Sequence, residues 1–231
     1  CILKGLSPAV RFEMGECRND YGGYFIVDGK EKCIVSQEKF APNMLNIQLA
    51  PNELYLGSAD VRSVSEDASK HVRTVGVTMV APIETRTNRQ MVVLVPNMRK
   101  PVPLFILMRA LGIISDKAII SVCLLDLDKY SDYVDEFIPS IHDAGSIFNQ
   151  ETALKYMATL SRNKTVAHVL DVLANYFLPH LGSTDMRAKA LYVGHMAREL
   201  LKVVRKESAP TDRDSFRFKR IELPGTLMRD L

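Results

Sequence analysis

The sequence predicts a mixed α+β fold in which two small β regions are followed by about six helices. Three observations predict it: an Asp-Gly hairpin signal near residues 24–35, strand patterns near residues 73–80 and 91–95, and helical periodicity from residue 101 onward. The chain has 231 residues, of which 47% are hydrophobic and 25% are charged, as in an ordinary globular protein. A chain of this length can bury a full core without a disulfide or a metal ion.

The β regions differ in their expected burial. Residues 24–27 and 32–35 flank Asp28-Gly29, whose tolerance of positive φ angles suits a two-residue type I′ turn. Apolar residues alternate with Thr and Gly over residues 73–80, which is typical of a half-buried strand. Residues 91–95 are continuously apolar and mostly β-branched, so we expect a more buried strand there.

Helical patterns fill most of the second half of the chain. The predicted helices span residues 104–111, 116–125, 130–142, 150–160, 165–177 and 185–206. The first is apolar almost throughout and should be buried on all sides, with Gly112 placed to end it. Arg109 is a single cation inside this helix. A buried guanidinium needs a carboxylate partner, and the two candidates are Asp116 and Asp126.

The last predicted helix separates apolar from basic residues. Its apolar side holds Ala190, Tyr192, Val193, Met196, Ala197, Leu200, Leu201, Val203 and Val204. Four cations lie within about 60° of one another on the opposite side and form what we call the basic stripe: Arg187, Arg198, Lys202 and Arg205. Gly194 lies on the same side, where its missing side chain permits close approach. Such a row is either a solvated helix face or a set of contacts to phosphate groups.

Charge is distributed unevenly, although the net formal charge is only +3. Residues 116–150 hold two basic and seven acidic residues, whereas residues 151–206 hold nine basic and four acidic ones. A molecule with this contrast can bind an anion on one face despite its weak average charge.

The sequence contains no catalytic constellation. It has no Walker loop, no GxSxG, no HExxH and no EF-hand loop, and its five His residues form no i, i+4 pair. We therefore predict no catalytic residue, no metal site and no cofactor in this chain. The four Cys, at positions 1, 17, 33 and 123, form no CxxC pair, which predicts free thiols in a reducing intracellular compartment. No apolar run is long enough to predict a membrane span.

Two stretches go beyond generic patterns. Residues 15–38 contain GEC, GGYFI, EKC and QE in that order, and residues 211–225 contain DRDSF, KR and ELPG. They resemble signatures of the second-largest subunit of multisubunit DNA-dependent RNA polymerases, and residues 109–113 and 177–180 match the same family in the same order. The chain begins without an initiator Met and ends on an unfinished apolar pattern, so we expect it to be a piece of a longer polypeptide.

The departures from the family pattern point to a source. Cys33 stands where the family usually has Val, Ser215 where cellular versions usually have His, and Pro224 where they usually have Ala. The TDRDSF form of the second motif looks closer to polymerases of large cytoplasmic DNA viruses. The resemblance thus implies a location in the virion or host cytoplasm if the protein is viral, and in the nucleus if it is cellular.

The resemblance implies a place within the enzyme. Residues 1–40 would be the end of the protrusion segment, residues 41–210 the lobe domain, and residues 211–231 the start of the return into the protrusion. In this family the lobe and protrusion form a DNA-facing wall of the cleft. The chain alone should be inactive as a nucleotidyltransferase. Mg²⁺ and a structural Zn²⁺ are expected elsewhere in the complete polymerase.

The expected partners are the template and non-template DNA strands, the largest subunit and the rest of this subunit, with no membrane. The residues expected to contact nucleic acid are the basic stripe (Arg187, Arg198, Lys202 and Arg205) and a second group from the KR motif, Lys219 and Arg220. The alternative is a non-catalytic module that binds neighbouring domains or transcription factors, for which the acidic helix at residues 130–142 would suit a basic partner.

Overall fold

The computed structural model describes residues 5–67, 69–82 and 89–229. The chain divides into a smaller unit, residues 1–40 with 216–231, and a larger unit, residues 41–215. The boundaries expected from the sequence lie after residues 40 and 210. Residues 211–215 stay with the larger unit because the Thr211 amide donates to the Ile47 carbonyl (2.9 Å) and the Ile47 amide donates to Thr211 Oγ1 (3.0 Å).

The smaller unit contains the predicted hairpin. Strands β1 (Tyr24–Val27) and β2 (Lys30–Cys33) pair antiparallel. The turn residues Asp28 and Gly29 have φ angles of 51° and 72°, as a type I′ turn requires. The hairpin near residues 24–35 is therefore confirmed.

A second strand pair in this unit joins distant parts of the chain. Strand β3 (Gln37–Phe40) pairs antiparallel with β9 (Lys219–Glu222), so that Phe40 lies opposite Lys219. The unit also contains two short α-helices, α1 (Pro8–Glu13) and α8 (Pro224–Arg229), and the 3-10 helix η4 (Phe216–Phe218), none of which was predicted from the sequence.

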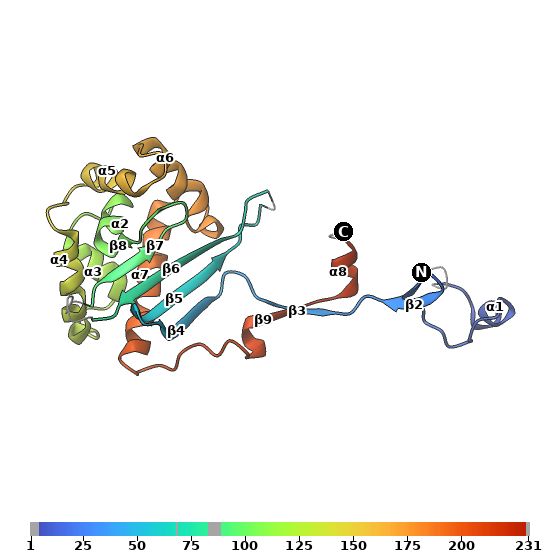
Figure 1. Cartoon of the computed structure of the whole chain (residues 1–231). Helices are drawn as coiled ribbons and strands as arrows, with labels where there is room; N and C mark the ends of the chain where they lie inside the picture. The colour runs from blue at the N-terminus through green and yellow to red at the C-terminus, as the bar shows by residue number, and fades with distance from the viewer. Residues whose placement is uncertain (1–4, 68, 83–88, 230–231) are drawn as a thin grey trace. The chain divides into compact units, whose positions relative to one another are not determined.

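The larger unit contains a five-stranded antiparallel sheet in chain order (Figure 1). Its strands are β4 (Leu45–Asn52), β5 (Tyr55–Ser63), β6 (Arg73–Val80), β7 (Met91–Leu94) and β8 (Val102–Pro103). The strands predicted near residues 73–80 and 91–95 are confirmed as β6 and β7. The expected half-burial of the first is wrong, because five consecutive residues of β6, from Val75 to Met79, are buried on both faces of the sheet. Strands β4, β5 and β8 were not predicted from the sequence, so the sheet is larger than expected.

Helices make up the rest of the larger unit. They are α2 (Leu104–Ala110), α3 (Asp116–Leu124), α4 (Ile138–Ala144), α5 (Gln150–Leu160), α6 (Val166–Asp171) and α7 (Met186–Val204), with the 3-10 helices η1 (Ser131–Phe137) and η3 (Pro179–Leu181) and the π-helical turn η2 (Val172–Tyr176). A helix lies at each of the six predicted places.

Two of the predicted helices differ in type from an uninterrupted α-helix. The segment 130–142 begins as η1, and the α-helix starts only at Ile138–Pro139, where the ring of Pro139 suits a first turn. The segment 165–177 is α-helical only as far as Asp171 and continues as the π-helical turn η2.

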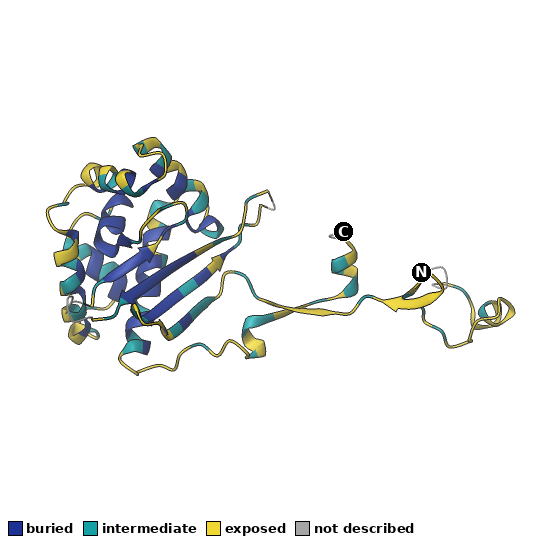
Figure 2. Ribbon diagram, in the orientation of Figure 1, coloured by how far each residue is buried: buried dark blue, intermediate teal, exposed yellow. Residues whose placement is uncertain are grey.

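The core of the larger unit lies between the sheet and the helices, which gather on one face of it (Figure 1). From the sheet, Val61, Val77 and Val93 are fully buried, and from the helices so are Phe105 and Leu200. Figure 2 shows the buried residues concentrated at this contact. The longest helix, α7, packs across β4, β5 and β6 and against α3.

Candidate nucleic-acid interface

Helix α7 carries the predicted basic stripe and is firmly anchored. Asp185 caps its N-terminus, since its carboxylate accepts from the Ala188 amide at 2.8 Å. Its buried residues are Lys189, Ala190, Val193, Gly194, Met196, Ala197, Leu200, Leu201 and Val203, and the predicted Tyr192 and Val204 are partly buried against the same core. The predicted apolar face is thus confirmed, and the stripe lies on a helix whose opposite side is fixed in the core.

Gly194 serves the packing of α7 rather than the surface. A Cβ at this position would lie 2.9 Å from the Val122 carbonyl oxygen and 3.1 Å from Cys123 Cα. The close approach that its missing side chain permits is therefore that of α3, inside the protein. Gly194 is buried, so it is not an exposed member of the basic stripe.

We expect Gly194→Ala to lower the free energy of unfolding by about 1–3 kcal/mol, because the added methyl group meets backbone atoms that cannot turn away. Urea unfolding of the full chain measures this. Gly225→Ala is the matched control, since Gly225 also lies in a helix but has open space around its Cβ position. Equal stability of Gly194→Ala and the parent would contradict the packing argument.

The middle of the stripe is organised around a carboxylate that the sequence analysis missed. Glu199 Oε1 lies 3.2 Å from Arg198 Nε and 2.8 Å from Lys202 Nζ. Burial acts to raise the pKa of Glu199, but the hydrogen bond and charge of Lys202 and the charge of Arg198 outweigh it and hold the pKa below its ordinary value. The i, i+3 spacing of Glu199 and Lys202 is the sequence signal that could have revealed this pair.

His195 adds a further contact to this cluster. Arg198 Nη2 lies 3.1 Å from His195 Nδ1. Burial is the main reason why the pKa of His195 falls below its ordinary value; Glu199 opposes the shift, and the neighbouring cations add to it. The side chains of Arg198 and Lys202 are 16% and 21% exposed, so both retain a surface that a ligand can reach.

The ends of the stripe differ from its middle. Arg205 donates to the Asp132 carbonyl at 3.0 Å and its guanidinium lies 4.4 Å from the centre of the Tyr133 ring, so it ties α7 to η1. Arg187 is exposed beside a surface hollow of about 620 Å³ that Ile113 and Val122 also line. The structure therefore brings Arg198 and Lys202 together and leaves Arg187 and Arg205 towards the two ends of the helix.

The second predicted group lies on strand β9 of the smaller unit. Lys219 pairs with the Glu38 carboxylate, and its ammonium lies 5.6 Å from the centre of the Phe40 ring. Arg220 is exposed and stands opposite Lys39 in the β3–β9 register. Lys219 thus holds the strand pair together, while Arg220 presents its side chain to solvent.

Arg109 has the carboxylate partner that its burial requires. Its side chain is 1% exposed, and Nη2 lies 2.5 Å from Asp116 Oδ1. Nη1 donates to the Ile147 carbonyl, and the guanidinium lies 5.3 Å from the centre of the Phe148 ring. Of the two candidate partners, Asp116 is confirmed and Asp126 is wrong. The arrangement joins α2, α3 and the segment after α4.

The stretch at residues 177–180 has a structural role as well. His180 Nδ1 lies 2.7 Å from Ser63 Oγ, and its ring meets the Tyr192 ring edge-on at 5.1 Å. Burial is the main reason why the pKa of His180 is lowered, with Lys189 adding to the effect. Leu178 is buried with a φ angle of 47°. These contacts fasten the chain after η2 to the end of β5.

The chemistry of the site is that of a charged surface. Among residues 5–67, 69–82 and 89–229, no three His, Cys, Asp or Glu side chains gather so that they could hold a metal ion. In the same part of the chain no helix is both long and apolar enough to cross a membrane. Cations spaced along one helix can attract and hold phosphate groups, and they carry no sequence information.

The fold and this surface define a class: an α+β module whose longest helix carries the paired cations Arg198 and Lys202. Comparison with known proteins gives the family. The family model described as RNA polymerase Rpb2, domain 2, matches residues 69–222, so the chain belongs to this family. The resemblance to the second-largest subunit of RNA polymerase is confirmed.

Relatives are found in eukaryotes and archaea. DNA-directed RNA polymerase II subunit RPB2 of Encephalitozoon cuniculi is 34% identical over 240 residues, and subunit 2 of Arabidopsis thaliana is 31% identical over 244 residues; each match covers 100% of this chain and 20% of the relative. DNA-directed RNA polymerase subunit Rpo2 of Saccharolobus solfataricus is 31% identical over 226 residues, or 95% of this chain and 19% of the relative. The chain thus spans about a fifth of the length of these relatives. They give no support to the resemblance to viral polymerases.

Proposed function

We propose that this chain is the part of a second-largest RNA polymerase subunit that forms a DNA-facing wall of the cleft, while reacting groups lie elsewhere. The complete enzyme would carry out template-directed RNA synthesis, and this chain would contribute shape and charge. The observation that carries the proposal is the pair Arg198 and Lys202, which lie next to each other and partly exposed on α7, whose other face is buried against the sheet.

We take the assignment of residues to polymerase domains from the family resemblance. Residues 1–40 and 211–231 would belong to the protrusion and residues 41–210 to the lobe domain. The division of the chain into units 1–40 with 216–231 and 41–215 supports this assignment. The partners would be the two DNA strands, the largest subunit and the rest of this subunit. Mg²⁺ and Zn²⁺ would be held outside this chain.

The relatives named as subunits of RNA polymerase II favour the nucleus as the place of action. The virion and host cytoplasm are the locations that a viral source would require. The reducing intracellular compartment predicted from the cysteines agrees with either location.

Salt-dependent binding of duplex DNA to the full chain tests the role of α7. We expect the variant Arg198→Gln/Lys202→Gln to make the slope of log K against log salt shallower by about 2, because each phosphate contact contributes about 0.9 to that slope. Glu199→Gln should bind more tightly than the parent, since it removes the carboxylate that both cations now share.

The matched control is Arg62→Gln/Lys117→Gln, which removes two exposed cations from other elements of the larger unit. This control should keep the parental slope. A parental slope in Arg198→Gln/Lys202→Gln would remove the α7 stripe as a DNA contact.

The second candidate function is a non-catalytic interaction module that binds neighbouring polymerase domains or transcription factors. The acidic side chains of η1 and the turn before it favour this alternative, since Asp126, Asp128, Asp132 and Asp135 are all exposed. Such a surface suits a basic partner. Cross-linking in the assembled polymerase separates the two functions: cross-links from the larger unit to DNA support the first, and their absence supports the second.

A further inference from the structure

Two loops of the larger unit meet and enclose a hollow that lies away from the α7 stripe. One loop joins β7 to β8, and the other joins α5 to α6. The hollow has a volume of about 560 Å³ and is lined by Asn97, Met98, Arg99, Arg162, Asn163 and His168. None of these residues belongs to the basic stripe or to the KR motif.

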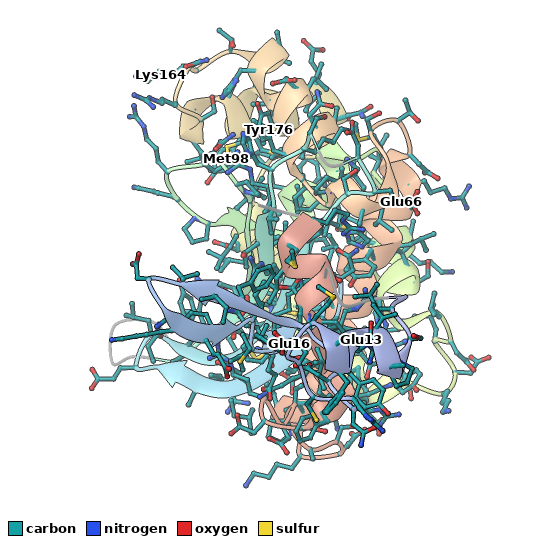
Figure 3. The ribbon with its side chains drawn as sticks, turned by 90° about the vertical axis from the view of Figure 1, so that its right-hand side faces the viewer. Glu13, Glu16, Glu66, Met98, Lys164 and Tyr176 are labelled. Atoms are coloured by element: carbon teal, nitrogen blue, oxygen red, sulfur yellow. The ribbon has the colours of Figure 1, made fainter. Side chains whose placement is uncertain are left out.

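Backbone hydrogen bonds fix the two loops against each other. Met98 and Ser161 form an antiparallel β-bridge, and the Arg99 amide donates to the Leu160 carbonyl at 3.0 Å. The Lys164 amide donates to Ser161 Oγ at 3.1 Å, and Lys164 has a φ angle of 53°, which turns the second loop sharply. Figure 3 labels one residue from each loop, Met98 and Lys164, both in the upper left of the view. The hollow therefore has a framework that exists before any ligand arrives.

The hollow is rich in donors and has no acidic neighbour in either loop. Residues 95–100 and 161–165 contain two arginines and two lysines, and neither Asp nor Glu; His168 at the hollow comes from α6. Within the described chain, neither Arg99 nor Arg162 has a side-chain hydrogen bond or an ion pair, and both are exposed. The stripe on α7 differs, since Glu199 already neutralises part of its charge.

These groups match the chemistry of a phosphodiester. Guanidinium groups bind phosphate oxygens through two parallel N–H donors, and Asn amides add further donors without adding a charge. Arg99 and Arg162 come from different loops, so a phosphate between them would be held from two sides. A hollow with cations and no carboxylate favours an anion over a protein surface of mixed charge.

We propose that this hollow binds the backbone phosphates of a nucleic acid, with Arg99 and Arg162 as the principal contacts. The inference rests on the proposed function for the identity of the polymer, and it adds a site on different elements from α7. A nucleic acid held at both places would contact the larger unit at α7 and at these two loops.

The test is the salt dependence of duplex DNA binding to the full chain carrying Arg99→Gln/Arg162→Gln. We expect the slope of log K against log salt to become shallower by about 2. The control Arg62→Gln/Lys117→Gln should keep the parental slope. Titration of inorganic phosphate serves as the second arm: it should perturb the amide NMR signals of Asn163 and Lys164 only at concentrations far above those at which duplex DNA perturbs them.

The outcomes separate this site from the α7 stripe. If Arg99→Gln/Arg162→Gln keeps the parental slope, the hollow is not a DNA contact and the proposal is wrong. If only Arg198→Gln/Lys202→Gln has a shallower slope, the proposed function of α7 stands and the hollow has no part in DNA binding. If only Arg99→Gln/Arg162→Gln has a shallower slope, the hollow is supported as a DNA contact and the α7 stripe is not. Saturation by inorganic phosphate at the concentrations that suffice for duplex DNA overturns the assignment to a polymer backbone.

Discussion

Replacement of Arg109 by Leu is expected to destabilise the larger unit by about 3 kcal/mol. Breaking a buried ion pair from one side typically costs about 3–5 kcal/mol, because the remaining partner loses its compensation. Here Asp116 is 39% exposed and can be hydrated in part, which places the loss near the lower end. The Ile147 carbonyl would lose its guanidinium donor as well. Urea unfolding at neutral pH measures the change.

Two controls show whether the loss comes from this pair. Asp116→Asn leaves the buried guanidinium without its counter-charge, so it should destabilise the larger unit as well. Lys155→Gln breaks an ion pair with Glu151 in which both side chains are well exposed, so its unfolding curve should overlay that of the parent. If Arg109→Leu is as stable as Lys155→Gln, the buried pair does not hold α2 to its neighbours.

Lys189 is expected to give the protein an unusual dependence of stability on pH. Its side chain is fully buried, and its ammonium donates to the carbonyls of Leu173 (2.6 Å) and Ala174 (2.8 Å) in the π-helical turn. Burial, and to a smaller extent the charge of Lys70, lowers the pKa of Lys189 from 10.5 to about 8. Between these two pKa values the unfolded chain carries one more proton than the folded chain. Stability from this group therefore rises with pH across that window.

Lys189→Met isolates this contribution. The unfolding free energy of the parent minus that of the variant should increase from pH 8 to pH 10.5, by at most about 1.4 kcal/mol per pH unit. Burial raises the pKa of Cys123 to about 12, which acts in the opposite direction at high pH, but it is common to both proteins and cancels.

Urea unfolding at a series of pH values measures the difference. Lys155→Met is the control, because that ammonium lies in water on α5 and its removal should leave the parental profile. Parallel profiles for Lys189→Met and the parent from pH 8 to pH 10.5 would show that Lys189 stays charged in the fold.

The helices were predicted well because the apolar residues of a buried helix face recur in the sequence with a period of 3.6 residues. In α7 the apolar residues from Ala190 to Val203 are buried as the periodicity predicts, whereas the periodicity did not show that α3 covers the opposite side at Gly194. The π-helical turn could not be predicted in this way, because the carbonyls that it frees are taken up by Lys189, a residue on another helix. Its cause is a tertiary contact, which local periodicity does not record.

The missed strands have a different explanation. In β4, Leu45, Ile47 and Leu49 alternate with Asn46 and Gln48, so a strand signal was available there. In β5 the central residues Gly57 to Asp60 are small or polar, and Ser58 and Ala59 are buried through tertiary packing with the neighbouring strands and α7. The candidate site divides in the same way. The stripe follows from helical geometry, whereas Arg99 and Arg162 are distant in sequence and meet only through the bridge between their loops.

The pairing of β3 with β9 has a consequence for how this chain is built. Phe40 and Lys219 face each other across the β3–β9 pair, so the chain leaves the smaller unit through β3 and re-enters it through the neighbouring strand β9. Residues 41–218 are thus an insertion between two paired strands, and its first and last residues follow and precede the facing residues Phe40 and Lys219. Such an insertion can be lengthened, shortened or replaced without breaking the β3–β9 pairing, because a short linker can join the two strand ends that its removal leaves.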